Sequence, residues 1–329
     1  MILLVGSPRS GTTWLAKIFD SHPRVLYRHE PDTVDRGHEL PIYCEGEKIE
    51  QNLDTARAYL DRLVRVRNTK STGSLPIFPK TYLAGPSLAL RKAMIVAAKA
   101  GERLPLVGDG FRRLDLPDMA DPTAPDIEIA IKSIGALGRV RLFLRARPDT
   151  RAIVIVRHPC GHVSSVLRGI ARNMFDDNKP ATEARGIYED LATTEPAKRR
   201  GLDADAFMAM TPEARLTWRW AIPNELAMAA ADDAAGRVRV VRYEDVCRAP
   251  EALARELFEF AGLDWQDQTA GFVGASTAGG DGNESYYQLF RDPLKSAMKW
   301  QQELSDEQQA AILAVAAETA PGRLFTEAA

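Results

Sequence analysis

We expect an α/β protein in which a central parallel sheet lies between two layers of helices, a three-layer sandwich. Short, wholly apolar segments recur along the chain, and segments with one apolar face at helical spacing separate them. The clearest apolar segment, Ala152 to Val156, has four β-branched residues in a row, which is typical of a strand covered on both faces. With 329 residues, 45% of them hydrophobic, the chain can bury a sizeable core, and we expect one domain over residues 1–329.

The expected elements follow in order from the N-terminus. Residues 1–5 form an apolar strand, a turn bounded by two glycines follows, and a helix begins at Thr12 or Thr13 and ends before Pro23. Later apolar runs predict strands, and amphipathic spacing predicts helices. The further predicted strands are 24–28, 104–107, 127–131, 152–156 and 238–241, and the predicted helices include 51–67 and 87–100.

Two segments interrupt this alternation. Polar residues rich in Ala, Glu and Arg predict a helical insertion at about 168–235, densest over 176–205. The glycine-rich stretch 274–283 predicts a mobile loop at about 270–290. We interpret 176–205 as an insertion and not as a linker between domains, and there is no internal repeat, so one domain is expected.

Charge and cysteine content exclude several classes of protein. The 43 Lys and Arg residues balance 45 Asp and Glu, which argues against a nucleic-acid-binding or membrane-surface protein. No apolar run reaches the roughly 18 residues of a membrane span. The three cysteines, Cys44, Cys160 and Cys247, lie too far apart for a disulfide framework or a zinc site. We therefore expect a cytoplasmic protein without a metal.

A phosphate-binding turn is expected between the first strand and the first helix. Backbone N–H groups and the positive end of a helix dipole bind phosphate at such a turn, and Gly6 and Gly11 let the backbone approach it. The spacing resembles a Walker A loop, which gives the expected sandwich its P-loop type, but Thr12 stands where the lysine would be. Arg9 is the nearest cation, so a nucleoside triphosphatase would lack its main β/γ-phosphate contact.

Two motifs resemble those of the sulfotransferases that use 3′-phosphoadenosine 5′-phosphosulfate (PAPS). The 5′-phosphosulfate loop of that family is similar to Arg9-Ser10-Gly11-Thr12-Thr13-Trp14. The family also has a strand that ends in Arg, with a Ser eight residues later, and this pair binds the 3′-phosphate; Arg157 and Ser165 match it. The resemblance, closer to the carbohydrate-type and bacterial branch, implies PAPS as co-substrate and adenosine 3′,5′-bisphosphate as product.

Weaker likenesses extend the resemblance toward the C-terminus. The segment 241–246 looks like the family's R-Y-E-D-L stretch, which implies that Tyr243 contacts the adenine; a core tyrosine is the alternative. Lys299-Trp300 and Leu304 resemble the family's C-terminal helix start. Arg291 falls roughly where relatives place a basic residue on the 3′-phosphate, so Arg291 and the glycine-rich loop could close over the nucleotide.

Sulfuryl transfer to an alcohol also needs charge stabilisers and a base. Arg9 and Lys132, which follows the strand 127–131, are the candidate stabilisers. In the small-molecule branch of the family this strand ends K-T-H with the histidine as base, whereas here Ile134 takes that position. Relatives of the carbohydrate type use a carboxylate after the second strand, which implies Glu30, with a pKa raised by partial burial. His29 is the second candidate base, and a solvated turn carboxylate is the alternative for Glu30.

Three functions therefore compete. The favoured one is sulfuryl transfer from PAPS to the hydroxyl of a small-molecule or glycan acceptor. The insertion and residues 32–85 are expected to line the acceptor site. The missing histidine favours a carbohydrate, glycolipid or other polar alcohol over a phenol. A P-loop kinase or NTPase acting on a small molecule would need a cation in place of Thr12 and an acidic residue for Mg²⁺, for which Asp109 is available. A non-catalytic nucleotide-binding module would leave Lys132 and Glu30 without a role.

Overall fold

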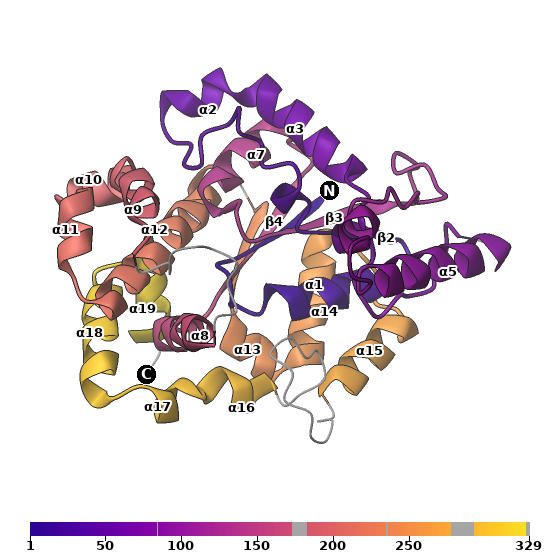
Figure 1. The fold of residues 1–329 in the computed structure, drawn as a ribbon. Coiled ribbons are helices and arrows are strands. Elements are labelled where there is room, and N and C mark those ends of the chain that lie inside the picture. The colour runs from indigo at the N-terminus through magenta and orange to yellow at the C-terminus, as the bar shows by residue number, and fades with distance from the viewer. Residues whose placement is uncertain (84, 173–182, 235, 278–292, 327–329) are drawn as a thin grey trace.

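Five parallel strands form one sheet in the order β2-β3-β1-β4-β5 (Figure 1). The computed structural model describes residues 1–83, 85–172, 183–234, 236–277 and 293–326. Within these residues the strands are β1 (Ile2–Val5), β2 (Val25–His29), β3 (Glu128–Ser133), β4 (Arg151–Val156) and β5 (Val238–Arg242).

The central strand β1 divides the core into two halves. Leu3 and Val5 point into a cluster formed with α3 (Leu53–Arg65), α7 (Val140–Ala146) and α12 (Pro212–Asp233). The alternating residues Ile2 and Leu4 point into a second cluster with α1 (Thr12–Ser21) and α14 (Pro250–Ala261). Successive strand side chains face opposite sides of a sheet, so a strand of four buried residues requires helices on both faces. The predicted three-layer sandwich is confirmed.

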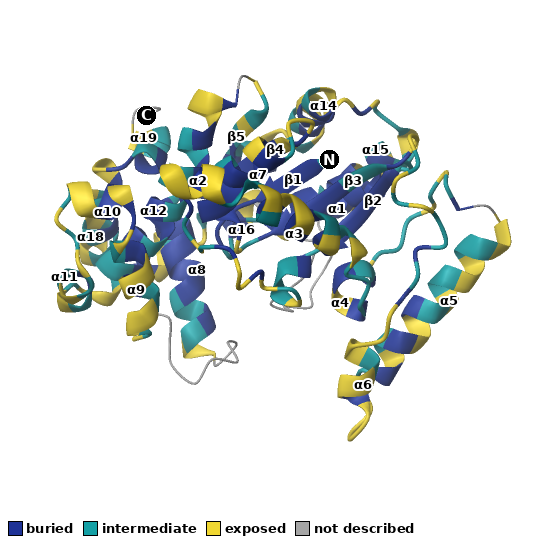
Figure 2. Ribbon diagram, turned by 90° about the horizontal axis from the view of Figure 1, so that it is seen from above, coloured by how far each residue is buried: buried dark blue, intermediate teal, exposed yellow. Residues whose placement is uncertain are grey.

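The remaining helices surround this framework, and Figure 2 shows the strands buried among them. They are α2 (Glu47–Gln51), α4 (Thr69–Thr72), α5 (Gly85–Gly101), α6 (Gly108–Arg112), α8 (Pro159–Ala171), α9 (Arg185–Ala192), α10 (Glu195–Arg199), α11 (Ala204–Ala209), α13 (Tyr243–Arg248), α15 (Asp267–Thr277), α16 (Pro293–Met298), α17 (Trp300–Glu303), α18 (Asp306–Ala317) and α19 (Ala320–Thr326), with the 3-10 helices η1 (Pro31–Thr33) and η2 (Leu137–Arg139). The segment predicted as a helical insertion thus holds α9 to α12 in its described part. Among the described residues, no helix combines the length and the apolar character that a bilayer crossing requires.

The sheet brings the ends of four strands to one edge. Val5 lies opposite Ser133 of β3 and Val154 of β4, and His29 of β2 lies opposite Lys132. Because all strands are parallel, the residues that follow β2, β3, β1 and β4 emerge side by side. The candidate residues near positions 9, 30, 132 and 157 therefore share this edge.

Two expectations from the sequence are wrong. The apolar run 104–107 is no strand but an exposed turn between α5 and α6, with Leu106 fully exposed, because no strand of the described sheet pairs with it. The predicted mobile loop at 270–290 begins as helix, since α15 continues to Thr277 and buries Phe272 and Val273. The rest of that predicted loop lies outside the described residues.

Candidate functional site

The turn between β1 and α1 is tightly constrained. Gly11 has φ 85°, in the left-handed region, and a Cβ at this position would overlap the ring of Tyr243. Arg9 also has a positive φ of 71°, which is costly for a residue with a side chain. Ser10 Oγ donates to Ser7 O at 2.6 Å and braces the turn. The backbone is thereby held in one conformation, with the N-terminus of α1 at its end.

Arg157, which follows β4, joins this turn to the helix α8. Its Nη1 donates to Arg9 O at 2.8 Å, and Arg9 Nε in turn donates to Ser165 Oγ on α8 at 3.2 Å. The Arg157 guanidinium also lies 5.3 Å from the ring centre of Tyr243, whose side chain is buried. The two predicted phosphate clusters, one at residue 9 and one at residues 157 and 165, are therefore in direct contact.

A second group of charges lies at the ends of β2 and β3. The Glu30 N–H donates to Lys132 O at 2.8 Å, and the chain turns away from the sheet at Glu30 with φ 45°. Lys132 Nζ donates to Glu30 Oε1, while Lys70 Nζ of α4 lies 2.9 Å from Glu30 Oε2. Each carboxylate oxygen of Glu30 thus faces its own ammonium group. Lys132 is almost fully buried, whereas Lys70 is half exposed.

The two ion pairs of Glu30, with Lys132 and Lys70, determine its ionisation. Burial alone would raise the pKa of Glu30, but Lys132, together with His29 and Lys70, outweighs burial and lowers the pKa to about 2. The raised pKa expected from the sequence is therefore wrong. Burial lowers the pKa of Lys132, and the attraction of Glu30 offsets only part of that. Burial and the nearby Lys132 also lower the pKa of His29 to about 3, so its imidazole is neutral at physiological pH.

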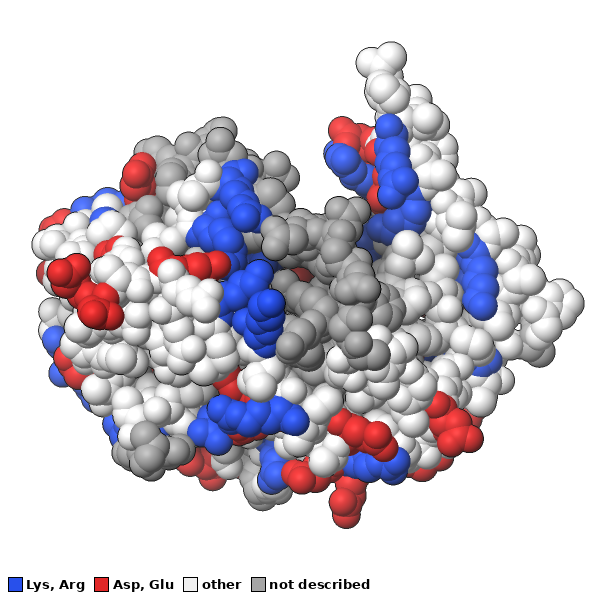
Figure 3. Space-filling view, turned by 90° about the horizontal axis from the view of Figure 1, so that it is seen from below, with Lys and Arg blue, Asp and Glu red and all other residues white. Residues whose placement is uncertain are grey.

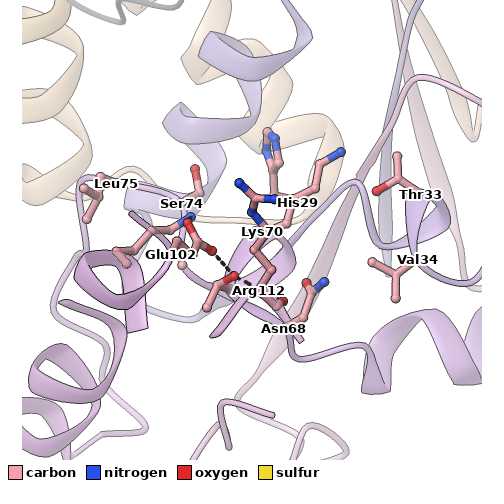
Figure 4. A pocket seen from close by; sticks show the side chains of 12 residues that line it. His29, Thr33, Val34, Asn68, Lys70, Ser74, Leu75, Glu102 and Arg112 are labelled. Carbon is pink, nitrogen blue, oxygen red and sulfur yellow. Dashed lines mark hydrogen bonds and ion pairs between the residues drawn. The ribbon is translucent and has the colours of Figure 1, made fainter. Parts of the chain in front are cut away.

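A pocket of about 680 Å³ opens beside this group. His29 and Lys70 line it, together with residues of α4, of α5 and of the segment that contains α6. Figure 4 shows His29, Lys70 and Arg112 on one side of the pocket, with Thr33 and Val34 across from them. The pocket therefore leads from solvent to His29 and to Lys70, which pairs with Glu30.

The whole chain was also compared with models of protein families. The model of the sulfotransferase family matches residues 2–267, a range that includes both predicted phosphate clusters, Glu30 and Lys132. The chain belongs to the sulfotransferase family.

Solved structures give more distant likenesses to this sulfotransferase. The sulfotransferase domain of the curacin biosynthetic pathway is 16% identical, with a TM-score of 0.46 and coverage of 97% of this chain and 96% of that one. The sulfotransferase domain of the Synechococcus PCC 7002 olefin synthase is 18% identical, with a TM-score of 0.47 and coverage of 97% and 93%. A mouse sulfotransferase complexed with PAP is 13% identical, with a TM-score of 0.47 and coverage of 100% and 88%. A search of the curated proteins found no match.

The sequence did not predict several residues of this sulfotransferase's site. Asp32 Oδ2 accepts a hydrogen bond from Ser133 Oγ, and burial raises the pKa of Asp32. Its Oδ1 is buried without a hydrogen-bond partner among the described residues. The signal that could have found Asp32 is its place two residues after Glu30, on the same turn. Lys70 gives no such signal, because only folding brings α4 to the end of β2.

The other predicted site residues have mixed outcomes. Thr12 and Thr13 lie in the first turn of α1, and Trp14 Nε1 donates to Ser276 Oγ of α15 at 3.1 Å. From the sequence, Tyr243 was predicted either to contact the adenine or to be a core residue. In the structure its side chain is buried against Gly11. Arg291 lies outside the described residues.

The alternative of a P-loop kinase or NTPase relied on Asp109 as the Mg²⁺ ligand. Asp109 lies in α6, 81% exposed and paired with Arg112, and not at a strand end. The described residues also contain no cluster of three His, Cys, Asp or Glu side chains that could hold a metal ion. An Mg²⁺-dependent kinase needs an acidic residue that follows a strand and binds Mg²⁺, and Asp109 does not have that position.

Proposed function

We propose that this sulfotransferase transfers the sulfuryl group of PAPS to an acceptor hydroxyl. The hydrogen bond from Arg9 to Ser165 carries the proposal, because it joins the turn after β1 to the residues after β4. A nucleotide with phosphate groups on both its 3′ and 5′ positions needs cationic or N–H donors at two neighbouring places, and this edge has both.

The order of the strands suggests how the substrates would lie. Arg157 and Ser165, at the end of β4, would hold the 3′-phosphate, and the turn at 6–13, after β1, would hold the 5′-phosphosulfate. Glu30 and Lys132 follow the next two strands. Strands lie about 4.8 Å apart, so roughly 14 Å separates β4 from β2, enough for a nucleotide and an acceptor in one row.

Arg9 and Lys132 are the proposed charge stabilisers. Their cationic groups would neutralise negative charge on the sulfuryl and bridging oxygens as the bond to sulfur breaks. PAPS supplies the sulfuryl group when it is bound. The helix dipole of α1 would add positive potential at the same turn.

Glu30 is the proposed general base. With its two lysine partners it is ionised and so able to accept the hydroxyl proton, but the low pKa makes it a weak base in this arrangement. Any shift of the Lys132 ammonium toward the donor would remove the strongest lowering contact and raise the pKa of Glu30. His29 stays the second candidate, and Asp32, whose pKa burial raises, is a third.

The pocket beside His29 is the proposed acceptor site. Its lining includes hydroxyl, amide and charged groups from Asn68, Thr69, Lys70 and Ser74, which suits a carbohydrate, glycolipid or other polar alcohol. The cytoplasmic setting and the single domain over 1–329 stay predictions from the sequence.

A thermal-shift titration tests the nucleotide. We expect adenosine 3′,5′-bisphosphate to raise the melting temperature more than ATP with Mg²⁺ does. A preference for ATP would favour the P-loop kinase. A panel of sugar, glycolipid and phenol acceptors with labelled PAPS then tests the transfer, and nucleotide binding without transfer to any acceptor would favour a binding module.

A further inference from the structure

Residues 85–114 form a projecting arm that consists of α5, an exposed turn and α6 (Figure 2). The arm carries a large share of the exposed bulky apolar side chains among the described residues. They are Leu90, Val96, Leu104, Leu106, Val107 and Leu114. Single exposed apolar residues are ordinary on a protein surface, but a contiguous group marks a site of interaction.

The outer face of α5 is apolar along its whole length. Its inner residues Ile95 and Ala98 pack against Leu116 in a small cluster separate from the main core. The exposed positions of the helix hold Gly, Pro, Ala, Leu and Val only: Gly85, Pro86, Ala89, Leu90, Ala93, Val96, Ala97 and Ala100. A surface helix of a free-standing domain normally turns charged residues outward, so this face has the pattern of one that is covered in use.

The charge of the arm is opposite to that of the chain. Residues 85–114 contain six basic and two acidic side chains, in a chain whose formal net charge is -2. Arg103 and Arg113 are exposed next to the apolar turn, and Arg112 beside them is exposed and paired with Asp109. Figure 3 shows the arm at the upper right, with an uncharged tip and charged side chains just beneath it.

We propose that the tip of this arm, Leu104, Leu106 and Val107, docks on an anionic lipid surface. Apolar side chains that enter the interface, with basic side chains level with the headgroups, are the two contributions that hold a peripheral protein on such a surface. The charge balance of the whole chain argues against a protein with a positive face, but it conceals this local excess. A second copy of the chain fits less well, because a symmetric contact through the arm would oppose two basic arms.

Docking would also orient the proposed acceptor pocket. Lys99 and Glu102 of the arm, with Arg112, form part of the pocket lining, so a lipid surface at the tip would lie near the pocket. An acceptor hydroxyl on an amphiphile could then reach Glu30 from that surface. This last consequence rests on the proposed sulfuryl transfer, whereas the docking itself does not.

Cosedimentation of the full chain with vesicles tests the docking. The vesicles are phosphatidylcholine alone and phosphatidylcholine mixed with phosphatidylglycerol, and binding is measured without PAPS. We expect binding to the mixed vesicles only, and a fall of about tenfold or more in the combined variant L104S/L106S/V107S. The variant R103A/R113A should weaken binding and reduce its dependence on salt. These side chains are exposed, so the variants should fold as the wild type does.

The matched control is I42S/L294S, which removes two exposed apolar side chains outside the arm. It should bind vesicles as the wild type does. The proposal is overturned if the wild type binds neither vesicle, if the control loses as much binding as the arm variant, or if the wild type is a dimer that only the arm variant dissociates. A thermal shift with adenosine 3′,5′-bisphosphate on the same samples reports the nucleotide site independently.

Discussion

Lys132 Nζ donates to Glu30 Oε1 across the ends of two neighbouring strands, and Lys70 faces the other oxygen of the same carboxylate. Two ammonium groups therefore keep one buried carboxylate ionised. The pair connects the β3 end of the sheet to the proposed acceptor pocket, since Lys70 and His29 line that pocket. Any change at Glu30 should consequently affect both the chemistry and the ionisation of the site.

Replacement of the proposed base tests its role in turnover. In Glu30→Gln the amide keeps the shape and can still accept from Lys132, but it cannot take up a proton. We expect kcat to fall by about a hundredfold or more, with adenosine 3′,5′-bisphosphate affinity unchanged within a few-fold. Steady-state kinetics and calorimetric titration give the two numbers. Asp32→Asn tests the third candidate base, and if it alone abolishes turnover, Asp32 and not Glu30 is the base.

The low pKa of Glu30 predicts a loss of stability in acid. Its pKa is about 2 in the folded chain against an ordinary 4.5, so between these pH values the unfolded chain binds more protons. The contribution of Glu30 is complete above pH 4.5 and is lost as the pH falls toward 2. It amounts to on the order of 3 kcal/mol in the free energy of unfolding.

Urea unfolding of the wild type and Glu30→Gln across this pH range measures that contribution. The difference in unfolding free energy between them should shrink as the pH falls. Glu50→Gln, an exposed carboxylate paired with Arg145, should keep the pH dependence of the wild type. A difference that stays constant from neutral pH to the acid limit would show that Glu30 is not held ionised by its lysines.

The contact between Arg9 and Ser165 predicts that both residues support nucleotide binding. We expect Arg9→Ala and Ser165→Ala each to weaken adenosine 3′,5′-bisphosphate binding by about tenfold to a hundredfold, because each removes a hydrogen bond to a charged group. Calorimetric titration gives the dissociation constants. Arg57→Ala, a half-exposed arginine paired with Asp54, is the control and should bind normally. Equal affinities in all four proteins would contradict the proposed nucleotide site.

Gly11 should tolerate no side chain. Gly11→Ala places a Cβ against the ring of Tyr243 at a positive φ, so we expect weaker nucleotide binding and a lower melting temperature. Gly271→Ala in α15 meets no neighbour within 4 Å and should be neutral or stabilising by up to about 1 kcal/mol. Circular dichroism melts and titrations of the two variants make the comparison. A Gly11→Ala protein with wild-type affinity and stability would contradict the packing described for the turn.

Local sequence predicted the sheet well because the relevant signals are local. Apolar runs such as residues 152–156 mark strands that are covered on both faces, and the Gly6 to Gly11 spacing marks the turn between β1 and α1. The same kind of signal failed at 104–107, where an apolar run is exposed. Apolar character alone does not say what covers a segment, since that depends on neighbours distant in sequence.

The amino-acid sequence by itself determined the five strands of the sheet, the turn after β1 and the identity of Arg9, Arg157 and Ser165 as candidates. Only the tertiary structure decided that Arg9 contacts Ser165 and that Lys70 reaches Glu30. The physical reason is that the pKa of a group depends on charges a few ångströms away, and folding chooses these from anywhere in the chain. The sequence therefore specifies which groups are present. The pairing of β2 with β3, which places Lys132 beside Glu30, and the packing of α4, which adds Lys70, specify the protonation of Glu30.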